Sequence, residues 1–180
     1  MNFKRWLGFV SLLGLVTVLA AGCTSTQPTG TVEFRAMDAP AAGVSKIMVP
    51  TSNIQIHKAD AAENSWITVV SQEMTFDLVA LQGAELFLGS ENVSSGNYTQ
   101  IRLDVDKVIV TLDGKEIIAK LPSDKLKVVG TWEVKAGQKT ILTLDFQADT
   151  FVNIEGNGQA LVNPVIKLAV SQGERPLKTK

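Results

Sequence analysis

The chain has 180 residues, of which 45% are hydrophobic, 19% charged and 6% aromatic, a composition typical of a single globular domain. Its 17 basic and 18 acidic residues leave a formal net charge of −1, which excludes the basic surface that nucleic-acid binding requires. One cysteine and one histidine are too few for a zinc site, a disulfide framework or a Cys–His catalytic pair. We therefore expect no metal, no cofactor and no enzymatic activity.

Residues 1–22 have the pattern of a secretory signal peptide. Lys4 and Arg5 precede an uncharged apolar run, residues 6–21, which ends in small side chains. The run is shorter than the roughly 20 residues that a transmembrane helix needs, and a polar stretch follows it directly. The sequence thus predicts a cleaved leader rather than a permanent membrane span.

The end of this leader, Leu19-Ala20-Ala21-Gly22-Cys23, resembles the lipobox of bacterial lipoproteins. The resemblance implies cleavage between Gly22 and Cys23 and attachment of a diacylglyceryl group to the Cys23 sulfur. The leucine of the motif stands one place early here, at Leu19. The alternative is ordinary cleavage near Ala21, which would leave Cys23 as a free thiol of a kind that secreted proteins usually lack.

Lipidation at Cys23 would hold the mature protein on a membrane, because each buried CH₂ group contributes about 0.8 kcal/mol. Residues 23–30 would then be the lipidated cysteine and a flexible tether rich in Ser, Thr, Pro and Gly. Loss of Lys4 and Arg5 with the leader would change the formal net charge from −1 to −3. We expect a lipid-anchored protein on the extracytoplasmic face of a cell membrane, inner or outer.

Residues 31–171 alternate between apolar and polar side chains with a period of two, which is typical of half-buried strands. Turn residues recur at short intervals between these runs. The pattern predicts an all-β, antiparallel β-sandwich of about eight strands, followed by a frayed tail over residues 172–180. The expected strands span residues 31–36, 46–58 with a break at Pro50, 66–70, 98–112, 115–121, 126–134, 140–146, 150–154 and 160–170.

Three local features are more specific. One short helix is expected from Asp77, as its N-cap, to Gly83, as the glycine after its last turn. Asp113-Gly114 predicts a type I′ hairpin turn. Tyr98 opens a strand just after a glycine, so we expect its hydroxyl to bond to the backbone near the edge of the sandwich.

Several segments in a fixed order resemble the family DUF4382, a domain of unknown function. They are Asp38-Ala39-Pro40, Trp66, Phe76-Asp77-Leu78, the segment from Ser95 to Leu103, and Asn163-Pro164-Val165-Ile166. The resemblance covers about residues 30–170. It implies a secreted or lipid-anchored protein with a transthyretin-like or carbohydrate-binding-like sandwich, and it assigns no catalytic residues.

Few side chains could carry chemistry. Arg102, Asp104 and Asp106 share one strand face, which we interpret as solvated rather than as a cation site. His57 is a lone histidine and is expected at the surface. Trp66 and Trp132 are candidate ligand contacts, because sugar-binding sandwiches stack aromatic rings on sugars, although core packing is the alternative for both.

The sequence favours a non-catalytic binding module of the cell envelope, whose ligand is a glycan, a wall polymer or a protein. The alternative is a structural or accessory subunit of an envelope complex without a small-ligand pocket. An exposed aromatic strip beside polar loops would favour the binding module, and an uncovered apolar sheet face would favour the accessory subunit.

Overall fold

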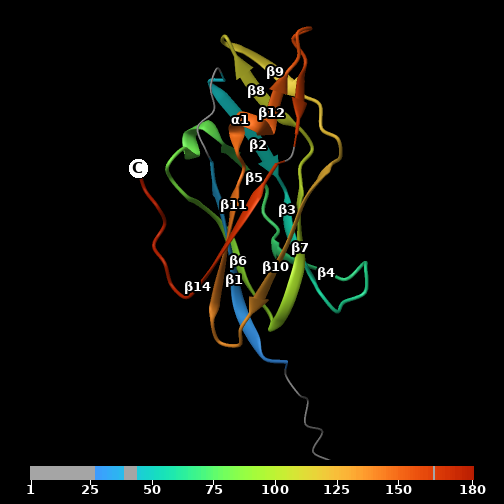
Figure 1. Cartoon of the computed structure of the whole chain (residues 1–180), viewed down its shortest axis with the longest axis vertical. Helices are drawn as coiled ribbons and strands as arrows, with labels where there is room; N and C mark the ends of the chain where they lie inside the picture. Colours follow the sequence, from blue (N-terminus) through green and yellow to red (C-terminus); the bar gives the residue numbers. More distant parts are fainter. Residues whose placement is uncertain (1–26, 39–43, 164) are drawn as a thin grey trace, which may run out of the picture.

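The computed structural model of the chain describes residues 27–38, 44–163 and 165–180. The expected leader, with its cleavage site between Gly22 and Cys23, lies outside the described residues. Most of the described chain forms β-strands, as the period of two predicts, in an elongated molecule (Figure 1). The described parts of the DUF4382-like segments therefore fall within a mostly β domain.

The described strands form three four-stranded sheets and one two-stranded sheet. Sheet I has the order β14-β11-β1-β6 and contains β1 (Thr29–Met37), β6 (Leu86–Ser94), β11 (Lys139–Asp145) and β14 (Lys167–Gln172). Sheet II has the order β10-β7-β3-β4 and contains β3 (Asn53–Lys58), β4 (Trp66–Val70), β7 (Gly96–Asp104) and β10 (Lys125–Val134). Sheet III has the order β5-β2-β8-β9 and contains β2 (Lys46–Thr51), β5 (Met74–Asp77), β8 (Val108–Leu112) and β9 (Lys115–Ala119). Sheet IV pairs β12 (Val152–Ile154) with β13 (Ala160–Val162).

The expectation of about eight strands was too low, whereas the expected antiparallel direction holds for every strand pair of the described residues except one. The described residues contain fourteen strands, because three expected strands are each divided between two sheets and because β5 and β6 were not expected. In sheet I, β1 pairs in parallel with β11, with Thr31 opposite Lys139 and Met37 opposite Asp145. Parallel neighbours need a long crossover, and here the crossover consists of most of the domain.

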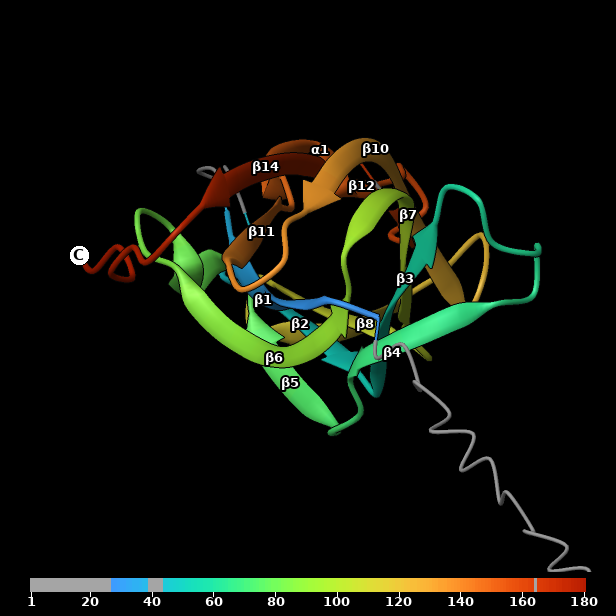
Figure 2. The same ribbon diagram turned by 90° about the horizontal axis from the view of Figure 1, so that it is seen from below.

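Sheets I and II pack face to face around a common core, as the view along the long axis shows (Figure 2). Sheets III and IV lie at the other end of the molecule (Figure 1). The inward residues of the first two sheets follow the alternation in the sequence. Those that are completely buried include Val32, Phe34, Ile54, Ile56, Tyr98, Ile101, Leu103, Leu142 and Leu144.

The expected strand 98–112 is two strands in different sheets. β7 ends at Asp104 in sheet II, and β8 begins at Val108 in sheet III. The buried positions change from odd numbers, ending at Val105, to even numbers, starting at Val108. An earlier change of parity, between the buried Tyr98 and Ile101, lies within β7 at its irregular pairing with β3. The change between Val105 and Val108 falls between the two strands and coincides with the crossing from sheet II to sheet III.

The short helix expected over Asp77–Gly83 is a single 3₁₀ turn, η1 (Val79–Leu81). Leu78 rather than Asp77 occupies the N-cap position, although Asp77 Oδ1 accepts the backbone N–H of Val79 at 3.1 Å from one residue earlier. The one α-helix of the described residues, α1 (Ala148–Phe151), overlaps the start of the strand expected over 150–154, and the remaining residues of that strand form β12. Phe151 is fully buried against Phe146, with ring centroids 5.6 Å apart, so packing of the aromatic rings holds this helical turn.

Two local predictions are confirmed. Asp113 and Gly114 both have positive φ, 49° and 76°, as a type I′ turn between β8 and β9 requires. The Tyr98 hydroxyl donates a hydrogen bond to the carbonyl oxygen of Ser94 at 2.7 Å, which ties the start of β7 to the end of β6.

The C-terminal segment, expected to be frayed, covers the outer face of sheet I. Glu33 and Arg35 point away from the core, yet they are only 6% and 3% exposed. Arg35 donates to the carbonyl oxygens of Arg175 at 2.6 Å and of Pro176 at 3.1 Å. Glu85 accepts both Nη groups of Arg175 at 2.9 Å. These polar contacts hold the segment because its partners are buried and charged.

Candidate functional site

The outer face of sheet II carries three cross-strand rows of mostly polar side chains, and we name this surface the Arg102 face. The register places its members directly opposite one another on adjacent strands. The rows are Lys125–Asp104–Asn53, Lys127–Arg102–Gln55–Thr68 and Val129–Gln100–His57–Trp66. Ile56 and Ile101, between these positions, are fully buried on the opposite face, so the surface results directly from the period of two.

A chain of hydrogen bonds crosses three strands in the middle row. Arg102 Nε donates to Gln55 Oε1 at 2.6 Å, and Gln55 Nε2 donates to Thr68 Oγ1 at 2.9 Å. Among the described residues, the two Nη groups of Arg102 have no hydrogen-bond partner. The guanidinium group is therefore oriented by its Nε while both of its terminal nitrogens stay available.

Trp66 fixes the same guanidinium from one side. The Arg102 Cζ lies 4.1 Å from the centroid of the Trp66 ring, a cation–π distance. The indole N–H donates to the carbonyl oxygen of Glu63 at 3.1 Å. Trp66 is half-buried, and Arg102 covers one face of its ring, so the free aromatic platform expected for this residue is replaced by an arginine supported on a tryptophan.

His57 is buried, and the expectation of a surface histidine was wrong. It is 7% exposed, because the loop over residues 59–65 folds across it. Its Nε2 lies 3.0 Å from the carbonyl oxygen of Ala62, and its ring centroid is 5.0 Å from that of Trp66. Its Nδ1 has no partner among the described residues. The histidine thus supports the loop that positions Trp66.

The row at the end of β7 is a charge pair. Lys125 Nζ donates to Asp104 Oδ1 at 2.7 Å, and Asn53 Nδ2 donates to Asp104 Oδ2 at 3.2 Å. Burial alone would raise the pKa of Asp104, but the hydrogen bonds from Lys125 and Asn53 outweigh it and lower this pKa below its usual value. Asp104 is therefore held as a carboxylate whose charge Lys125 compensates.

A pocket of about 330 Å³ borders this row, where sheet II meets sheet III. Its walls include three carboxylates, Glu73, Asp104 and Asp106. Asp106 lies beyond the end of β7, so it does not share the face of Arg102 and Asp104 as the alternation suggested. Among the described residues, no group of three His, Cys, Asp or Glu side chains is arranged to hold a metal ion.

Trp132 belongs to the core, which removes it as a candidate ligand contact. It is 4% exposed, and its ring stacks on Tyr98 with centroids 5.9 Å apart and an interplanar angle of 15°. Its indole nitrogen has no partner among the described residues. Trp132 shares its parity with the buried Leu126, Val128 and Val134, so the alternation along β10 points its side chain inward.

The central role of Arg102 was missed by the sequence reasoning, which considered this residue only as part of a solvated charged face. Its partners come from other strands, since Gln55 lies 47 positions earlier and Thr68 a further 13 positions from Gln55. Only the period of two in each strand was a signal, because it places each of these residues on a polar face.

The comparisons with known proteins define the family. The sequence model described as "Domain of unknown function (DUF4382)" matches residues 29–164. The chain belongs to this family. Among curated proteins, none matches the DUF4382 chain significantly. None of the described helices combines the length and hydropathy that crossing a membrane would require.

Three solved structures with a similar chain path are each described as a "putative cell adhesion protein". The protein from Bacteroides eggerthii has 10% identity and a TM-score of 0.40, over 81% of this chain and 55% of that chain. The protein from Parabacteroides distasonis has 9% identity and a TM-score of 0.43, over 82% and 52%. The protein from Bacteroides ovatus has 10% identity and a TM-score of 0.31, over 83% and 46%. The DUF4382 chain thus spans about half the length of these proteins, and the similarity is too low to indicate a shared activity.

Proposed function

We propose that this DUF4382 protein is a lipid-anchored binding module of the cell envelope, and that the Arg102 face binds an extracytoplasmic polymer. The observation that carries the proposal is the fixed guanidinium of Arg102. Trp66 and Gln55 already restrict its side chain, so a ligand that bonds to its free Nη groups avoids much of the entropic cost of ordering it.

The leader pattern and the lipobox-like ending at Cys23 support the anchor. β1 begins at Thr29, so only residues 24–28 separate a lipidated Cys23 from the first strand. Five extended residues span at most about 18 Å, which would hold the domain close to the membrane surface. A module in this position meets the polymers of the envelope.

The proposal includes no catalysis. The sole histidine, His57, is buried beneath the loop over residues 59–65 and contacts Trp66 and Ala62 rather than a nucleophile. A general base must lie within hydrogen-bonding distance of the group that it activates. The environment of His57 supports a structural role.

The anchor is tested with Cys23→Ser in the native host. We expect wild-type protein to incorporate labelled palmitate and to sediment with membranes. The Cys23→Ser variant should take up no label and should remain as an uncleaved precursor or leave the membrane fraction. An unlabelled wild-type protein in the culture fluid would contradict the lipoprotein assignment.

The binding surface is tested with the full-length chain in mild detergent on an array of envelope polysaccharides and wall polymers. We expect wild type to bind at least one polymer and Arg102→Ala to bind it at least tenfold more weakly, since a hydrogen bond to a charged group contributes about 1.5 to 3 kcal/mol. Lys115→Ala, which removes a cation at the Asp113-Gly114 hairpin, should bind like wild type. An array without any bound polymer would refute the proposed function.

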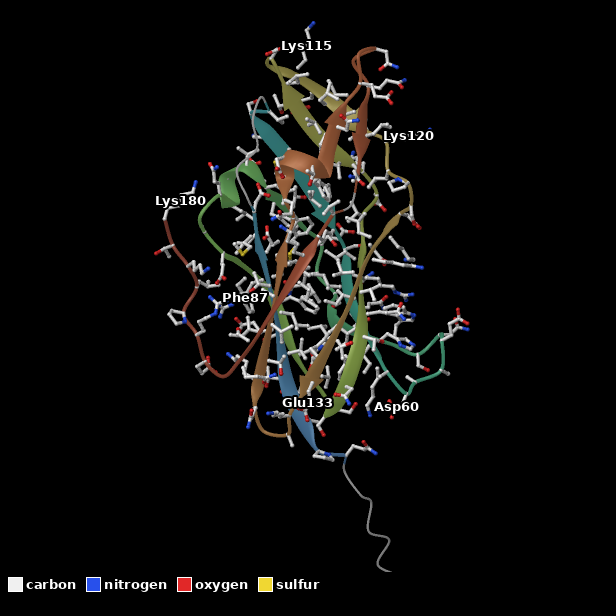
Figure 3. The ribbon with its side chains drawn as sticks, viewed as in Figure 1. Asp60, Phe87, Lys115, Lys120, Glu133 and Lys180 are labelled. Atoms are coloured by element: carbon white, nitrogen blue, oxygen red, sulfur yellow. The ribbon has the colours of Figure 1, made fainter. Side chains whose placement is uncertain are left out.

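An accessory subunit is the second candidate, and one apolar spot favours it. Phe87, labelled in Figure 3, is 47% exposed. Leu177 is 40% exposed in the C-terminal segment, whose Lys178 carbonyl oxygen accepts the backbone N–H of Glu85. If this spot holds a partner protein, Phe87→Ser should abolish its co-purification while Arg102→Ala leaves it unchanged. The reverse result favours the polymer-binding module.

A further inference from the structure

We infer that the ligand of the Arg102 face is an acidic polysaccharide, whose carboxylate or phosphate groups bind Arg102 and Lys127. This inference rests on the proposed function and specifies its ligand. It follows from the balance of charges on the face, from the geometry of the two cations, and from Val129 and Gln100 in the row beside them.

The Arg102 face is cationic on a chain whose net charge is −1. Its three rows hold Lys125, Lys127 and Arg102 against a single carboxylate, Asp104. Lys125 compensates Asp104 directly at 2.7 Å, which leaves the charges of Arg102 and Lys127 without a salt-bridge partner among the described residues. Arg102 also attracts Asp104 through space, but the face still carries two more cations than carboxylates, and such a surface selects for anions.

Arg102 and Lys127 are directly opposite each other on β7 and β10. Side chains in this relation have Cβ atoms about 4.5 to 5.5 Å apart, so both can contact the same acidic group or two successive ones. A guanidinium with two free Nη groups matches the two oxygens of a carboxylate or a phosphate, whereas lysine acts as a point charge. The pair therefore combines geometric selection with general attraction.

The neighbouring row indicates a sugar rather than a peptide or a small anion. Val129 is 80% exposed and offers an apolar surface to the C–H groups of a sugar ring. Gln100, half-buried beside it, has a side-chain amide with no hydrogen-bond partner among the described residues, and amides bind hydroxyl groups well. Hydroxyls, C–H faces and acidic groups occur together in acidic polysaccharides.

The acidic pocket limits the surface at its other end. Glu73 and Asp106 line this pocket beside Asp104, and a polyanion placed there would be repelled. The chain of an acidic polysaccharide would therefore extend from Arg102 and Lys127 toward Gln100 and Val129. Polymer binding across this region needs no enclosed cavity.

The test uses the full-length chain in mild detergent and measures binding by isothermal titration. The ligands are two acidic polysaccharides, polygalacturonate and phosphorylated dextran, together with neutral dextran and poly-L-glutamate. We expect at least one of the two acidic polysaccharides to bind. Its affinity should fall at least tenfold between 50 mM and 500 mM NaCl, because salt screens the surface charges. Which of the two binds more tightly distinguishes carboxylate from phosphate. Dextran and poly-L-glutamate should bind at least tenfold more weakly.

The variants separate geometry from charge. Arg102→Lys keeps the charge but loses the planar fork, and it should weaken binding by about tenfold. Arg102→Gln should weaken binding at least as much as Arg102→Lys does. Lys127→Gln should weaken it several-fold. Lys115→Gln is the matched control, because Lys115 lies at the end of the molecule opposite the loop that carries Asp60 (Figure 3). It should leave the affinity unchanged, and thermal unfolding of each variant checks that the fold persists.

Four results would overturn the inference. If neutral dextran bound as tightly as the acidic polysaccharides, acidic groups would not be needed for binding. If poly-L-glutamate bound as tightly, a sugar would not be needed. Arg102→Lys binding like wild type would remove the geometric role of the guanidinium. Finally, the array could show binding of a neutral envelope polymer while titration shows no binding of an acidic polysaccharide. This result would refute the inference and leave the proposed function standing.

Discussion

Glu85→Ala should destabilise the protein through the buried ionic cluster on the outer face of sheet I. The Glu85 side chain is 1% exposed and accepts hydrogen bonds from Arg35 Nη1 at 3.0 Å and from both Nη groups of Arg175 at 2.9 Å. The backbone N–H of Lys178 also donates to it, at 3.3 Å. Truncation to alanine removes the acceptor for all of these donors at once.

The expected loss is about 3 kcal/mol in the free energy of unfolding. Removing one partner from a buried ion pair costs roughly 3 to 5 kcal/mol, because the other charge stays buried and uncompensated. Arg35 would keep Glu33, whose Oε1 lies 2.6 Å from its Nη2, and Arg175 is 32% exposed and could turn toward water. Both features place the loss at the lower end of that range.

Urea unfolding followed by tryptophan fluorescence measures this loss, and amide hydrogen exchange localises it to β1, β11 and the C-terminal segment. Glu174→Ala is the matched control, since Glu174 is 81% exposed in its 3.0 Å pair with Lys139. An exposed pair contributes at most about 1 kcal/mol. Equal losses for the two variants would refute the claim that the cluster holds the C-terminal segment through buried charge.

Two further outcomes are expected. Burial would raise the pKa values of Glu33 and Glu85, but their hydrogen bonds with Arg35, Lys139 and Arg175 outweigh it and lower both. Both carboxylates therefore contribute fully to stability above their unfolded pKa of 4.5, and this contribution is lost as the pH falls through their lower folded pKa values. The urea midpoint of the wild type should accordingly fall below about pH 4.5. The midpoint of Glu85→Ala should fall less steeply with pH, because one of the two carboxylates is absent. Trp132→Ala should cost about 3 to 5 kcal/mol, because this side chain is 4% exposed and its removal leaves a cavity against Tyr98. A nearly unchanged melting temperature for this variant would place Trp132 outside the core.

The inward faces of the strands could be predicted because the period of two is a local property. Val32 and Phe34 on β1, and Ile54 and Ile56 on β3, are all fully buried as the alternation requires. The Asp113-Gly114 turn was equally predictable, since its conformation depends on two adjacent residues. Such features need no knowledge of which strands become neighbours.

The candidate site was only partly predictable. Alternation placed Arg102 on a polar face, but nothing local indicated that Trp66 would support its guanidinium or that Gln55 would orient it. Trp132 shows the opposite failure, because the alternation of β10 already places it on the same face as the buried Leu126 and Val128, yet its burial was left open. Cross-strand neighbours depend on register between distant segments, and register is set by the whole fold.

The sequence by itself determined the strand-rich class, the core faces and the family, all of which rest on short-range patterns. The tertiary structure alone decided that β1 is buried on both faces. Glu33 and Arg35 have the polar character of an exposed surface, and their burial is stable only because Glu85 and Arg175, 50 and 140 positions from Arg35, complete their charge pairing. A buried charge needs partners in space, and neighbours along the chain do not reveal whether distant segments will provide them.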